Sequence, residues 1–110
     1  MKKIDEYLKS YIEKSIFPLY EKNDTGHNID HIQYVINRSL KFAPQFKNIN
    51  LDMVYTVAAF HDLAHHIDKD NHETLSAKLF YENEEMKKFF TPKQREIIKN
   101  AIEDHRASLN

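Results

Sequence analysis

The chain has 110 residues, of which 16 are basic and 17 acidic, so its formal net charge is −1, and it contains no cysteine. The charge balance lacks the basic excess of a nucleic-acid-binding surface, and the absence of cysteine excludes disulfides and thiolate metal sites. No stretch approaches the roughly 20 apolar residues of a membrane span, and the polar N-terminus lacks the apolar core of a signal peptide. We therefore expect one domain over residues 1–110, in the cytoplasm, with neither nucleic acid nor membrane as a partner.

The first predicted helix covers Lys3 to Ser15. Its apolar residues recur at helical spacing, as Ile4, Leu8, Ile12 and Ile16. Pro18 should end or kink this helix, because proline disfavours the α conformation in the residue before it. We expect Ile16–Tyr20 to form a short turn of helix that packs on the core.

A second helix should begin near His27 or Asn28, after a sharp turn at Gly26, and should end before Pro44. Its apolar stripe consists of Ile32, Val35, Ile36 and Leu40. His31 lies four residues before Val35, so the pattern places it at the edge of this stripe.

The third predicted helix begins at Asn50 or Asp52, either of which can act as its N-cap, and ends near His66 or Ile67. Its buried face is predicted to hold Val54, Val57 and Ala58 and to continue into His61, with Asp62 beside it. A carboxylate and an imidazole on a buried face need partners, because burying an unpaired charge is costly.

A fourth helix should begin near His72, with Asn71 as its cap, and present Leu75, Leu79 and Phe80 together with the small Ser76 and Ala77. The charged stretch from Glu82 to Lys88 is interpreted as a solvated face. Thr91 and Gln94 form a capping box around Pro92 and start a fifth helix. This helix should bury Ile98, Ala101 and Ile102 and carry His105 on the same face. The sequence thus predicts an all-α bundle of about five helices.

Several side chains on or beside these faces are potential metal ligands: His31, His61, Asp62, His72 and His105. Imidazole and carboxylate bind divalent transition metals such as Mn, Fe, Zn, Co and Ni. A set without thiolates favours a site with open positions, where bound water becomes nucleophilic. Each histidine taken alone is more often a hydrogen-bonded core residue than a metal ligand. His65 and His66 are interpreted as capping or exposed residues, and His27 either shares the site or simply starts its helix.

The order and spacing of four segments resemble the HD-domain superfamily of metal-dependent phosphohydrolases. The segments are Gly26–Val35, Val57–Leu63, His72–Ala77 and Ala101–Ser108, so the resemblance covers residues 25–110. It implies a helical fold with the metal site between helices. It also implies that His31, His61 and Asp62 bind one ion, that His72 and His105 serve a second ion where two are present, and that Asp62 bridges them.

The resemblance further implies a hydrolase whose partner is a small phosphorylated substrate, a nucleotide by family analogy. Asp62 and Arg106 are the implied catalytic residues, and Arg106 and Lys69 are the candidate contacts for substrate phosphate. A surface charge is an equally good interpretation of Arg106. Two alternatives stay open: an HD-fold di-iron oxygenase, and a non-catalytic metal-binding or interaction module.

The sequence departs from the family pattern in two places. Many members have an arginine where this chain has Gln33-Tyr34 before Val35. The family motif also continues to a further aspartate ligand beyond the position of His105, and Asp104 should point elsewhere on the helix. We therefore expect a fragment, a short form of the fold, or a partner chain that supplies the carboxylate, so that a homo-oligomer stays open.

Overall fold

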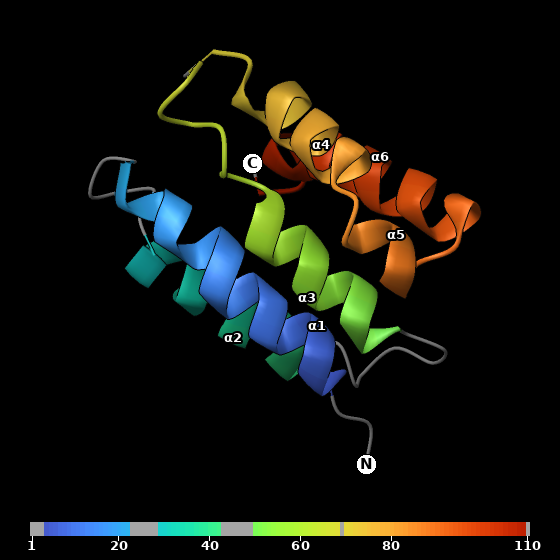
Figure 1. Cartoon of the computed structure of the whole chain (residues 1–110). Helices are drawn as coiled ribbons and strands as arrows, with labels where there is room; N and C mark the ends of the chain where they lie inside the picture. The colour runs from blue at the N-terminus through green and yellow to red at the C-terminus, as the bar shows by residue number, and fades with distance from the viewer. Residues whose placement is uncertain (1–3, 23–28, 43–49, 69, 110) are drawn as a thin grey trace.

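The computed structural model describes residues 4–22, 29–42, 50–68 and 70–109, apart from the side chains of residues 40–42 and 105–109. Within these residues the chain is all-α, as the sequence predicts, and has no strand. Helix α3 lies in the middle and packs against η1 and α2 on one side and against α4 and α6 on the other (Figure 1). The helices are α1 (Glu6–Tyr11), η1 (Ile12–Ile16), η2 (Phe17–Lys22), α2 (Ile29–Phe42), α3 (Leu51–Phe60), α4 (His72–Glu82), α5 (Met86–Phe89) and α6 (Pro92–Leu109).

The N-terminal segment changes its helix type where the sequence predicts an end or a kink. Asp5 caps α1 by accepting hydrogen bonds from the backbone N–H groups of Tyr7 and Leu8. The chain then continues through the π-helix η1, which ends at Ile16, into the 3₁₀-helix η2, a short helical segment that buries Phe17 and Tyr20 on the core as expected. The Phe17 N–H donates to a carbonyl five residues back, and this wide turn places Pro18 at the start of η2. A proline there is tolerated because it has no N–H that needs a partner.

Helix α3 begins where the sequence predicts and ends earlier. The Asn50 side chain accepts a hydrogen bond from Met53 N at 3.2 Å, which confirms Asn50 as the N-cap. The α-helix stops at Phe60, so the predicted continuation to His66 or Ile67 is wrong. Residues 61–67 instead form successive turns, which we call the His61–Ile67 turn. Their hydrogen bonds join residues three apart: Leu63 N to Phe60 O, His65 N to Asp62 O, and Ile67 N to Ala64 O.

The C-terminal half contains one helix that the sequence pattern did not reveal. The stretch from Glu82 to Lys88 was predicted as a solvated face, but it contains the start of α5, whose Met86 is fully buried. The capping box of α6 is confirmed: Gln94 N donates to Thr91 Oγ1 at 3.2 Å, and Thr91 N donates to Gln94 Oε1 at 2.9 Å.

The core gathers side chains from all of these helices around α3. Phe60 and Phe80 meet edge to face, with ring centroids 5.3 Å apart, and join α3 to α4. The predicted stripes of α1 and η1, of α2 and of α6 supply Leu8, Ile12, Ile16, Ile32, Ile36, Ile98 and Ile102.

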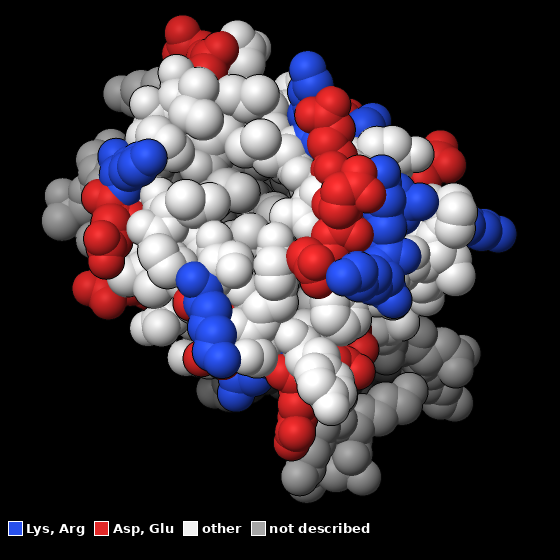
Figure 2. Space-filling model, in the orientation of Figure 1, with Lys and Arg blue, Asp and Glu red and all other residues white. Residues whose placement is uncertain are grey.

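The surface carries charges of both signs. On the face drawn in Figure 2, acidic and basic side chains lie next to one another around a largely uncharged middle. Close ion pairs include Lys87–Glu84 and Lys88–Glu85, which join α5 to the residues just before it, and Lys99–Glu103 on α6, each 2.9–3.1 Å long. Among the described residues, none of the helices combines the length and the apolar character needed to span a bilayer.

Candidate metal centre

Asp62 lies at the centre of a cluster of histidines from different elements. It follows α3 directly, in the His61–Ile67 turn, and its side chain is only 8% exposed. One carboxylate oxygen, Oδ2, is 3.4 Å from His61 Nε2 and 3.9 Å from His31 Nε2, which comes from α2. The other oxygen, Oδ1, is 3.1 Å from Nε2 of His72, the first residue of α4. The carboxylate therefore joins a first set, His31 and His61, to His72 through its two oxygens.

The first set has the donor types and spacing of a metal site. Ligand atoms of His31, His61 and Asp62 all lie within 4.8 Å of one another. Bonds of about 2.0–2.2 Å to one ion, in tetrahedral or octahedral geometry, separate neighbouring ligand atoms by about 2.8–3.6 Å. The 3.4 Å separation between His61 Nε2 and Asp62 Oδ2 lies within this range, and the 3.9 Å separation between His31 Nε2 and Asp62 Oδ2 is slightly wider.

The tautomer of His61 is fixed by a backbone carbonyl. His61 Nδ1 lies 2.7 Å from Ala58 O, and a carbonyl can only accept, so Nδ1 carries the proton. The neutral ring then has its lone pair on Nε2, the nitrogen that faces Asp62. Metal-bound histidines are typically oriented by a contact of this kind on the other ring nitrogen.

The Oδ1 side of Asp62 is lined by residues at the start of α4. His72 Nε2 is 3.6 Å from Glu73 Oε1 as well as 3.1 Å from Asp62, and the His65 ring meets the His72 ring with centroids 5.0 Å apart. The loop before α4 is held by Asp68, whose carboxylate accepts hydrogen bonds from Asp70 N, Asn71 N and Asn71 Nδ2. These hydrogen bonds set the position from which His72 reaches the cluster.

The His61–Ile67 turn is held from two sides by hydroxyl groups. On one side, the fully buried Tyr20 of η2 donates its hydroxyl hydrogen to Ala59 O in the last turn of α3. On the other side, Ala64 N donates to the fully buried Ser76 Oγ of α4 at 2.9 Å. The turn that carries His61 and Asp62 is thus tied to elements before and after it in the chain.

The structure brings together four of the five residues predicted as metal ligands: His31, His61, Asp62 and His72. Their roles as ligands stay a prediction. His27 and Lys69 lie outside the described residues, as do the side chains of His105 and Arg106, although α6 itself extends to Leu109.

Three residues near the cluster were missed or misjudged from the sequence. Glu73 is buried, and the signal for it was present, since it shares a helical face with the buried Ser76, Ala77 and Phe80. His65 was interpreted as capping or exposed but is 7% exposed, whereas His66 is exposed as expected. Nothing in the sequence pattern indicated that the Tyr20 hydroxyl reaches the end of α3.

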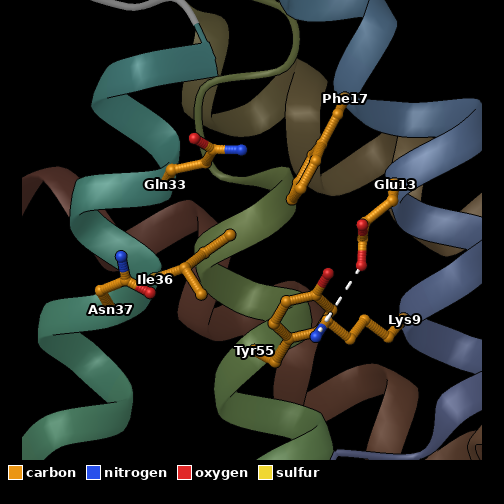
Figure 3. Close-up of a pocket in the computed structure, with 7 residues that line it drawn as sticks. All are labelled: Lys9, Glu13, Phe17, Gln33, Ile36, Asn37 and Tyr55. Carbon is orange, nitrogen blue, oxygen red and sulfur yellow. Dashed lines mark ion pairs between the residues drawn. The ribbon is translucent and has the colours of Figure 1, made fainter.

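A pocket of about 290 Å³ lies apart from this cluster, between the N-terminal helical segment, α2 and α3 (Figure 3). Its floor carries the Tyr55 hydroxyl, which is buried and has no hydrogen-bond partner within the described part of the chain. Burial and the nearby Glu13 carboxylate raise the pKa of Tyr55, so the hydroxyl stays protonated. The lining residues are Lys9, Glu13, Phe17, Gln33, Ile36, Asn37 and Tyr55, and none belongs to the histidine cluster.

Comparison with known proteins gives one family. The family model described as HD domain matches residues 28–110, a range that contains His31, His61, Asp62 and His72. No curated protein and no solved structure matches the chain. The match covers far more than half of the sequence, and the histidine–aspartate pair stands at the centre of the site. The chain belongs to the HD domain family, whose members bind divalent metal ions.

Proposed function

We propose that this chain is a metal-dependent phosphohydrolase that cleaves a phosphate ester or anhydride, with a nucleotide as the substrate class. The observation that carries the proposal is the position of Asp62, whose Oδ2 faces His31 and His61 while its Oδ1 faces His72. Family membership supports the reaction class, since HD domains are typically hydrolytic.

The residues fit a divalent transition metal because they offer nitrogen and oxygen donors without sulfur. His31, His61 and Asp62 would hold one ion, and His72 with Asp62 Oδ1 would contribute to a second. Such an ion supplies Lewis acidity and lowers the pKa of water, which is the chemistry that phosphate hydrolysis requires. Two neutral histidines and one carboxylate leave a divalent ion with a net positive charge, so the site attracts an anionic phosphate.

Access to the cluster is uneven in a way that suits a small substrate. The His61 and Asp62 side chains are 3% and 8% exposed, whereas the His31 side chain is 36% exposed. A phosphate group would therefore approach from the His31 side. The buried first part of the turn, residues 61–65, keeps water away from the opposite side and strengthens the electrostatic interactions there.

The test is phosphate release from nucleoside mono-, di- and triphosphates and from p-nitrophenyl phosphate, with Mn²⁺, Fe²⁺, Zn²⁺, Co²⁺ or Ni²⁺ added. We expect turnover with at least one metal and its loss in His61→Ala and Asp62→Asn. His66→Ala is the matched control, because His66 lies in the same turn but is exposed. Stoichiometric metal binding with no turnover on this panel would contradict the hydrolase proposal. Oxygen consumption by an iron-loaded sample would point to the oxygenase alternative.

A further inference from the structure

At the end of α3, the carbonyl group of Ala59 bonds to the Tyr20 side chain instead of to the backbone. In a continuing α-helix the Leu63 N–H would bond to Ala59 O, but here it donates to Phe60 O at 3.1 Å. Ala59 O instead accepts a hydrogen bond from the Tyr20 hydroxyl. A side chain from η2 thus satisfies a carbonyl group that the early end of α3 releases.

The same hydroxyl also reaches the backbone of Asp62. Burial and the Asp62 carboxylate raise the pKa of Tyr20 well above its usual value, and a hydrogen bond with the Asp62 backbone offsets this only in part. The hydroxyl donates to Ala59 O, and its hydrogen bond with the Asp62 backbone, in which the Asp62 N–H is the donor, places it beside Asp62 as well. It bridges the last turn of α3 and the first residues of the His61–Ile67 turn.

We infer that Tyr20 is a positioning residue for the metal centre: its hydroxyl fixes the backbone of Ala59 and Asp62 and so sets the direction of the Asp62 carboxylate and the His61 ring. Tyr20 precedes residues 28–110, the range matched by the family model. The N-terminal segment therefore contributes to the site through a contact that lies outside the family match. This inference rests on the proposed metal-binding function of the cluster.

The geometry explains why the contact affects the ligands. His61 Nδ1 donates to Ala58 O, one residue before the carbonyl that Tyr20 holds, and Asp62 is the residue whose N–H Tyr20 contacts. Loss of the hydroxyl lets the Ala59 carbonyl and the Asp62 N–H rotate. The ligand atoms of His61 and Asp62 then no longer point toward one position. Contacts that orient metal ligands typically change metal affinity about 10–100-fold when they are removed.

The experiment compares Tyr20→Phe with Tyr11→Phe in the full chain. Tyr11 is the matched control, because it belongs to the same N-terminal segment but its hydroxyl accepts a hydrogen bond from Asn83 Nδ2 at 3.0 Å, after α4, instead of bonding to the end of α3. Mn²⁺ dissociation constants are measured by calorimetry, beside thermal unfolding of each metal-free variant. We expect about 10–100-fold weaker binding for Tyr20→Phe and little change for Tyr11→Phe. The visible absorption of bound Co²⁺ should also change in Tyr20→Phe, which a loss of stability alone would not produce.

Three outcomes would overturn the inference or its basis. Unchanged Mn²⁺ affinity and Co²⁺ spectrum in Tyr20→Phe would show that the hydroxyl only stabilises the fold. Equal weakening in both variants would show general loosening of the N-terminal segment. A wild type that binds no Mn²⁺ would refute the proposed function itself, so the two failures are distinguishable.

Hydrogen exchange of the wild-type chain is a second measurement, which needs no variant and still tests the inference if Tyr20→Phe does not fold. In the wild-type chain, the Asp62 amide should exchange its hydrogen as slowly as amides in the middle of α3, because it is buried and bonded to Tyr20. Exchange at the rate of an exposed turn would overturn the inference.

Discussion

Replacing Ser76 by alanine tests the hydroxyl that holds the His61–Ile67 turn from the side of α4. Ser76 and Ala64 are both fully buried, and their hydrogen bond is 2.9 Å long. The substitution leaves the Ala64 N–H buried without its acceptor, which costs about 1–3 kcal/mol. Alanine recovers up to about 0.5 kcal/mol through its higher helix propensity. We therefore expect the free energy of unfolding to fall by about 0.5–3 kcal/mol.

Urea denaturation followed by circular dichroism measures this change. With a denaturant slope of about 2 kcal/mol per M, the midpoint should fall by about 0.25–1.5 M. Thr74→Ala is the matched control on the same helix, because Thr74 is exposed and its replacement should leave the midpoint unchanged or slightly higher. A Ser76→Ala midpoint equal to that of the wild type would show that the Ala64–Ser76 hydrogen bond does not hold the turn.

Two further predictions concern single polar groups. Tyr55→Phe should keep or raise the free energy of unfolding, by up to about 1 kcal/mol, because it removes a buried hydroxyl with no partner within the described residues; a clear loss in urea denaturation would refute this. For Asp68, hydrogen bonds from the Asn71 side chain, then from the backbone of Asn71, lower the pKa of the carboxyl group. Its contribution to stability should thus be present above the usual aspartate pKa of about 3.9 and be lost as the pH falls through the lowered value. The stability difference between wild type and Asp68→Asn should shrink from pH 7 to pH 3, and a constant difference would contradict the contact.

The sequence predicts the fold correctly where interactions between residues close in the sequence determine it. The Thr91 and Gln94 capping box and the Asn50 cap each act through hydrogen bonds within a few residues, so the residue types alone predict them. The end of α3 could not be predicted in this way. Its apolar spacing continues past Phe60, and the helix ends there while hydroxyl groups from η2 and α4 bind the backbone on either side.

The same distinction between local patterns and distant contacts applies to the residues of the site. His31, His61, Asp62 and His72 were predicted because helical spacing and the order of the segments place them on or beside buried faces. Glu73 followed from the same spacing but was overlooked beside His72. The Tyr20 contact joins residues 39 apart in the sequence, and no periodic pattern encodes such a contact.

The metal content per chain of the purified protein, measured by elemental mass spectrometry, tests the central claim most directly. The wild type and the control His66→Ala should carry transition metal in near-stoichiometric amount, and His61→Ala should carry none. A wild type without metal, even after incubation with Mn²⁺, Fe²⁺ or Zn²⁺, would contradict a metal centre at Asp62. Equal metal content in His61→Ala and the wild type would place the ion elsewhere in the chain.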